Sequence, residues 1–149
     1  MIPHQPPWMD IVWDQLGVQE HLGAGKSNPV IDKYHRSVAD DGTPDDVAWC
    51  SSTANYIMET AGFKGTDSRA GISWEKWGVG LGIPAYGCLI TLWYTTPSDW
   101  RRHVGFFLGF VGDDVIVAGG NQSNEFRISR YPQARVMSHR WPDKGTING

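Results

Sequence analysis

The alternation of apolar and polar residues divides the chain into a helical first half and a strand-rich second half. Apolar residues recur at helical spacing from Trp8 to Leu16 and from Val30 to Val38, and the second run follows an Asn28-Pro29 pair typical of a helix start. A polar loop then precedes a third run, which begins near Trp49 and stops at Gly62. The pattern predicts helices at 8–16, 29–38, 49–61 and 72–77.

After Pro84 the apolar runs become short and β-rich, and glycine or acidic turns separate them. Gly112-Asp113-Asp114 is typical of a hairpin turn. Helices followed by an antiparallel sheet of about five strands indicate an α+β domain. We expect Gly78 to Gly82 to form a turn and the tail after Pro142 to be loosely held. The predicted strands are Cys88–Tyr94, His103–Val111, Asp114–Ala118, Glu125–Ser129 and Val136–Trp141.

Length and charge narrow the class of protein. The 149 residues fit one domain, with a core from about residue 8 to 142 and no separate binding domain. A net charge of −3 leaves no basic face for phosphates, which argues against a nucleic-acid partner. The sequence shows neither a secretory signal nor a membrane-crossing run, so we expect the protein to be made in the cytoplasm. We also expect it to be a monomer. The two cysteines, Cys50 and Cys88, are expected to be free thiols.

The candidate chemistry centres on Cys50, at the predicted start of the third helix. Unpaired N–H groups and the helix dipole favour a negative charge there, and a thiolate is the attacking form of cysteine. The alternative is a buried cysteine that acts as a small hydrophobe, and position alone leaves the two about even. His103 opens a predicted strand, and Asn121 lies just beyond the next one. An antiparallel pair of strands would bring the imidazole and the amide together as a base and its orienting group.

From about Trp8 to Pro142 the sequence resembles the phage- and prophage-associated branch of the CHAP and NlpC-like cysteine hydrolases. The joint occurrence of several motifs in order carries this resemblance. They are Asn28-Pro29 with Ile31 and Tyr34, Trp49-Cys50, Ala61-Gly62, Ser73-Trp74 with Trp77-Gly78, His103-Val104-Gly105-Phe106, Gly119-Gly120-Asn121-Gln122, and Tyr131-Pro132 before Arg140 and Pro142. The resemblance implies a papain-like α+β fold and a peptidoglycan hydrolase that cuts an amide bond, as an endopeptidase or an amidase.

Carried onto this chain, the resemblance makes Cys50 the nucleophile, His103 the general base and Asn121 the orienting residue. The backbone N–H of Cys50 would stabilise the oxyanion, with Gln122 as a second donor, and Trp49 and Trp74 are further candidates for the substrate or oxyanion site. No cofactor or metal is implied. The expected partner is bacterial peptidoglycan, met after release or delivery from the cytoplasm, and the expected setting is a phage endolysin or virion lysin. A toxin delivered to a rival cell would add an immunity protein.

Three alternatives remain open. A zinc site from Cys50, Cys88, His103 and His139 would lack the close ligand spacing of structural zinc. A glycoside-cleaving enzyme would need two carboxylates, and Glu20 is the best acid among the four scattered glutamates. A phage tail or binding protein could keep the fold without turnover.

Overall fold

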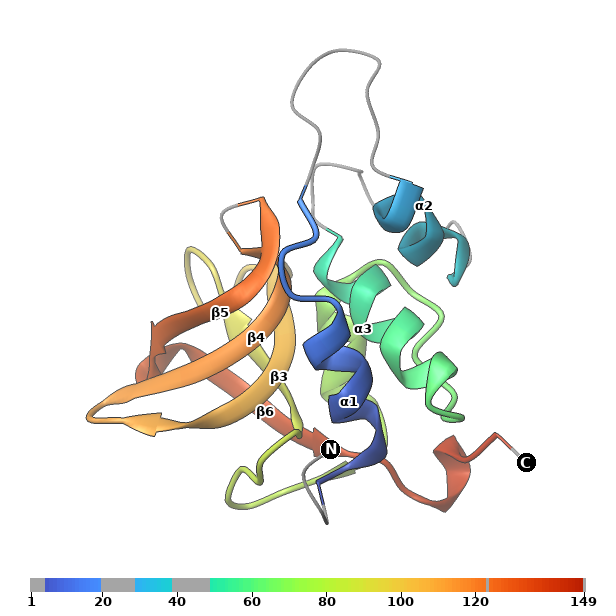
Figure 1. The fold of residues 1–149 in the computed structure, drawn as a ribbon. Helices are drawn as coiled ribbons and strands as arrows, with labels where there is room; N and C mark the ends of the chain where they lie inside the picture. The colour runs from blue at the N-terminus through green and yellow to red at the C-terminus, as the bar shows by residue number, and fades with distance from the viewer. Residues whose placement is uncertain (1–4, 20–28, 39–48, 123, 149) are drawn as a thin grey trace.

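The computed structural model describes residues 5–19, 29–38, 49–122 and 124–148, and its helices precede its main strands in the chain. In Figure 1, α1 and α3 lie together beside a curved sheet, with α2 on the far side of α3. The helical elements are α1 (Pro7–Asp14), α2 (Pro29–Arg36), α3 (Cys50–Thr60) and the 3₁₀ turns η2 (Gly71–Lys76), η3 (Gln133–Arg135) and η4 (Lys144–Thr146). The strands are β1 (Val79–Gly80), β2 (Leu89–Trp93), β3 (Arg102–Val111), β4 (Asp114–Gln122), β5 (Glu125–Pro132) and β6 (Val136–Trp141).

The described strands form one antiparallel sheet in the order β1-β6-β2-β3-β4-β5. β2 lies at its centre, where Leu92 pairs with His103 of β3 and Leu89 pairs with Arg140 of β6. The predicted hairpin turn between β3 and β4 is confirmed, and Gly112 adopts a φ of 58° there. Helices packed on an antiparallel sheet confirm the α+β prediction.

Buried apolar side chains form two clusters, one on each face of the sheet. Leu89 and Phe106 pack with the helices in the first cluster, and Ile90 and Phe107 belong to the second. Adjacent residues of β2 thus serve opposite faces, as the period of two requires. Each fully buried side chain of this kind stabilises the fold by roughly 1.5–3 kcal/mol. Apolar packing on both faces therefore stabilises the sheet that carries β3 and β4.

Two expectations about the fold are wrong. Val79 and Gly80, expected in a turn, form a sixth strand against Trp141 and Arg140 of β6. The tail is not loose: Lys64 N–H donates to the Thr146 carbonyl at 2.6 Å, and Ile147 bridges to Phe63. In both places the pairing comes from strands or loops distant in sequence, which local composition does not encode. No described helix has the length and apolar character needed to cross a bilayer.

Candidate active site

Cys50 is the first residue of α3, as the sequence predicted. Trp49 precedes it and accepts the Thr53 N–H through its carbonyl at 2.9 Å, so the first turn of the helix closes on the site. The Trp49 ring stacks on Tyr34, with ring centroids 6.0 Å apart. Cys50 itself is 2% exposed. The thiol is therefore held by a rigid, buried helix start.

The sulfur of Cys50 lies against β3 and the end of β2. It hydrogen-bonds to the backbone of Val104, the residue after His103, and to the Tyr94 side chain, as well as to the backbone of its own helix start. Burial nevertheless raises the pKa of the Cys50 thiol, and the hydrogen bonds only oppose that effect. The expectation that the helix start holds a resting thiolate is therefore wrong, because desolvation outweighs it.

His103 is fixed by the side-chain amide of Gln122. The imidazole Nε2 lies 2.8 Å from Gln122 Oε1, while the amide NH₂ of Gln122 donates to the carbonyls of Val117 and Arg127 at 3.3 and 2.5 Å. Because those two carbonyls accept only from a donor, the amide oxygen must be the atom that faces the ring. Nε2 therefore carries the proton, and Nδ1 presents its lone pair.

The electrostatic surroundings keep His103 uncharged. Burial lowers its pKa from 6.5 to about 4, the Gln122 hydrogen bond partly opposes this, and the positive charge of Arg135 adds to the lowering. His103 is 2% exposed. At neutral pH the thiol and the imidazole are thus both neutral, and the imidazole is free to accept a proton.

Two glycines of β4 allow the helix and the histidine to approach the same strand. A side-chain carbon added at Gly120 would lie 2.7 Å from both the Trp49 ring and Thr53 Oγ1. One added at Gly119 would lie 3.2 Å from His103 Nε2 and from Gln122 Oε1. Larger residues would push α3 or the imidazole away. The Gly119-Gly120 pair is therefore a spacing requirement of the site.

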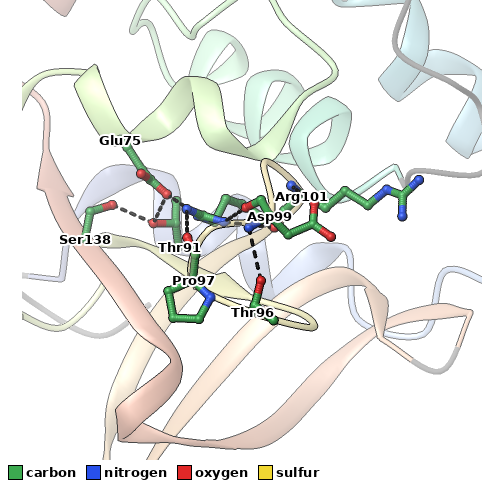
Figure 2. A network of polar contacts seen from close by, with 8 residues as sticks. Glu75, Thr91, Thr96, Pro97, Asp99, Arg101 and Ser138 are labelled. Atoms are coloured by element: carbon green, nitrogen blue, oxygen red, sulfur yellow. Dashed lines mark hydrogen bonds and ion pairs between the residues drawn. The ribbon is translucent and has the colours of Figure 1, made fainter.

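The loop from β2 to β3 begins and ends at this site. It leaves the sheet at Tyr94, whose hydroxyl lies 3.3 Å from His103 Nδ1, and returns at Arg102. The Arg102 guanidinium donates to Glu75 at 2.7 Å and to the carbonyls of Pro97, Asp99 and Arg101. Figure 2 shows Glu75 and Thr91 in one polar network with the loop residues Pro97 and Asp99. The buried guanidinium of Arg102 thus holds the loop in place, one residue before His103.

The chain matches no protein-family model and no curated protein sequence. Its structure matches the crystal structure of a Staphylococcus aureus subsp. aureus Mu50 protein described as similar to lipoprotein, NLP/P60 family. The TM-score is 0.53 at 18% sequence identity. The fold is similar to that of an NLP/P60 protein. The match covers 93% of this chain but 41% of the other, so the chain spans about two fifths of that protein's length.

The hydrogen-bond partner of His103 is the residue next to the predicted one. Gln122, and not Asn121, makes the described side-chain hydrogen bond to His103. Asn121 has a φ of 59°, so the backbone turns at that residue and Gln122 follows the turn into the site. The expectation of Gln122 as an oxyanion donor is also contradicted, because both of its N–H bonds already serve backbone carbonyls.

The two tryptophans expected at the substrate or oxyanion site are instead part of the core. Trp49 is 2% exposed, and Trp74 is fully buried with its indole N–H donated to Ser51 Oγ at 3.0 Å. Trp49 is the N-cap residue of α3, and Trp74 contacts the first turn of that helix through Ser51. Direct contact with substrate is incompatible with these positions.

The residues considered for zinc do not converge. Cys88 is buried in the second apolar cluster, where burial raises its pKa to about 11, and His139 Nδ1 lies 3.2 Å from the Leu81 carbonyl. Within the described residues, no three His, Cys, Asp or Glu side chains gather around one point. Glu20, the acid considered for glycoside cleavage, lies outside those residues.

Sequence reasoning missed Tyr94 and Arg135. Tyr94 ends a predicted strand, and His103 opens the strand that follows it. The antiparallel pairing of those two strands was the available signal, since it brings residue 94 back toward residue 103. Arg135 carried no such signal, because it reaches the carbonyls of Trp93 and Tyr94 from η3, 2.9 Å from each.

Proposed function

We propose that the protein is a cysteine hydrolase that cleaves an amide bond of bacterial peptidoglycan through an acyl-enzyme. The observation that carries the proposal is a thiol at the first turn of α3 and an imidazole that contact the same Tyr94 side chain, with the Nδ1 lone pair of His103 set by Gln122. The NLP/P60-like fold and the sequence motifs support the same substrate class. Cys50 is the nucleophile, His103 the general base and Gln122 the orienting residue.

The neutral resting pair defines the order of events. His103 takes the thiol proton as the sulfur of Cys50 attacks the peptide carbonyl, which gives a tetrahedral intermediate. The intermediate collapses when the C–N bond breaks, and the imidazolium returns its proton to the departing amine. Water, deprotonated by His103, then hydrolyses the thioester. The products are a new amine and a new carboxylate, and the thiol is regenerated.

The test is digestion of purified peptidoglycan followed by mass spectrometry of the fragments. Wild-type protein is expected to release fragments with new amine ends, while Cys50→Ala and His103→Ala release none. Cys88→Ala is the matched control, because Cys88 is a second buried thiol that belongs to the other apolar cluster. Since the Cys50 sulfur forms the covalent intermediate, its loss is expected to lower turnover by at least about 10⁴-fold.

Three outcomes would reject the proposal. They are full activity in Cys50→Ala, reducing sugar ends in place of amines, and binding of peptidoglycan without cleavage. The fragment masses also distinguish an endopeptidase from an amidase, because only an amidase separates the peptide from the sugar. The phage or delivered-toxin setting rests on the sequence resemblance alone, because the similar solved structure is described as a lipoprotein.

A further inference from the structure

We propose that Tyr94 is a third catalytic residue, whose hydroxyl carries the proton from the Cys50 thiol to His103. The inference deepens the proposed function and uses the same site. Tyr94 contacts both reacting groups: its hydroxyl lies 3.3 Å from His103 Nδ1, and its side chain hydrogen-bonds to Cys50. The residue is 38% exposed while Cys50 and His103 are 2% exposed, so Tyr94 connects the buried pair with the surface.

The direction of each hydrogen bond follows from Gln122. Because the amide NH₂ of Gln122 is used by Val117 and Arg127, its oxygen requires Nε2–H on His103 and leaves Nδ1 as an acceptor. The Tyr94 hydroxyl must therefore donate to Nδ1. Its oxygen is left with lone pairs, which accept the S–H of Cys50. The chain of donors runs in one direction, from sulfur through oxygen to nitrogen.

The proton transfer along this chain is balanced. The S–H bond of Cys50 breaks and its proton forms a new O–H bond on Tyr94, while the original Tyr94 proton forms an N–H bond on His103 Nδ1. The products are a thiolate, an imidazolium and an unchanged neutral tyrosine. The reverse path returns the proton when the leaving amine needs it. No other reactant is consumed.

The surroundings hold Tyr94 in this position and keep it protonated. Arg135 donates to the Tyr94 carbonyl at 2.9 Å, which fixes the backbone at the point where β2 ends. Burial raises the pKa of Tyr94, and it raises the pKa of neighbouring Tyr131 to about 12. Neither phenol therefore ionises near neutral pH. His103, by contrast, titrates below neutral pH.

The test compares Tyr94→Phe with Tyr131→Phe by alkylation of Cys50 with iodoacetamide. Phenylalanine keeps the ring and the cover over the site, so only the hydroxyl is removed. Tyr131 is the matched control because its ring lies 5.5 Å from the His103 ring while its hydroxyl hydrogen-bonds to Ser129. At pH 7 the Tyr94→Phe rate is expected to fall about tenfold, the effect of losing one hydrogen bond to a charged group. Tyr131→Phe should stay within about twofold of wild type.

The pH profile separates proton transfer from a structural effect. In wild type the rate is expected to rise as His103 loses its proton near pH 4 and then to level off. The alkylation rate of Tyr94→Phe should keep rising with hydroxide concentration. Its deficit relative to wild type should therefore shrink above about pH 9. Peptide mass spectrometry identifies the labelled cysteine, and Cys88 in the same sample reports any unfolding.

An unchanged or faster rate in Tyr94→Phe, or a deficit that is constant with pH, would overturn the inference. A faster rate would mean that the hydroxyl only shields the thiol. The assay contains no peptidoglycan, so a failure of the proposed substrate class leaves this result intact, and the converse also holds.

Discussion

Arg102 and His103 are adjacent on β3, yet they belong to two networks of opposite character. Arg102 is 5% exposed and forms an ion pair with Glu75, with three backbone carbonyls around its guanidinium. His103 is as deeply buried but has a neutral amide as its partner and Arg135 as the nearby charge, so it stays neutral. Successive residues of a strand face opposite sides, which is why one peptide step separates a charged network from a neutral one.

Burial alone does not decide the chemistry of these two polar residues. A buried charge persists where a counter-ion and hydrogen-bond acceptors surround it. Glu75 supplies the counter-ion for Arg102, and it also accepts from Thr91 at 3.3 Å. His103 lacks a carboxylate among the contacts described for it, and so it can exchange a proton. The first network holds the loop in place, and the second is suited to reaction.

Arg102→Met is expected to give the largest loss of stability. The variant leaves Glu75 without its counter-ion and leaves the loop carbonyls without their hydrogen-bond donor. This should lower the free energy of unfolding by about 3–5 kcal/mol. Urea denaturation monitored by tryptophan fluorescence measures this. Arg101→Ala is the control, because Arg101 is exposed, and its effect should stay within about 0.5 kcal/mol. Equal losses in the two variants would contradict the assigned role of Arg102.

Acid should destabilise the wild type through His103. The unfolded chain binds a proton on this residue below about pH 6.5, whereas the folded chain does so only below about 4. The contribution of His103 to the free energy of unfolding is therefore fully present above pH 6.5. It decreases as the pH falls toward 4, by about 3 kcal/mol in total. Urea midpoints at several pH values test this against His103→Asn. If both proteins lose the same stability over that range, the neutral assignment is wrong.

Gln122→Glu should convert the neutral network into one resembling that of Arg102. A carboxylate facing Nε2–H stabilises the imidazolium and is expected to raise the pKa of His103 by roughly 1–3. NMR titration of the imidazole protons measures this. Asn121→Asp places the same charge one residue earlier at a φ that Asp tolerates, and a smaller rise is expected there. A larger rise in Asn121→Asp would return the orienting role to Asn121.

Local sequence patterns encode the helices and strands and most of the residues of the candidate site. Helical periodicity located α1 and α3, and the β-rich runs after Pro84 located β2 to β6, because these patterns reflect which face each segment buries. The sequence also identified Cys50 as a helix start and His103 as a residue near a strand start. These properties are local: each depends on residues within one or two turns of the position concerned.

Which of these groups meet, and in which protonation state, depends on the packing of distant segments. It selected Gln122 over Asn121 through one left-handed residue, and it brought Tyr94 to the thiol and the imidazole from the far side of a loop. It also made the resting pair neutral, since desolvation depends on every segment packed around a group. Partner, register and burial are set by residues distant in the chain, and no local pattern records them.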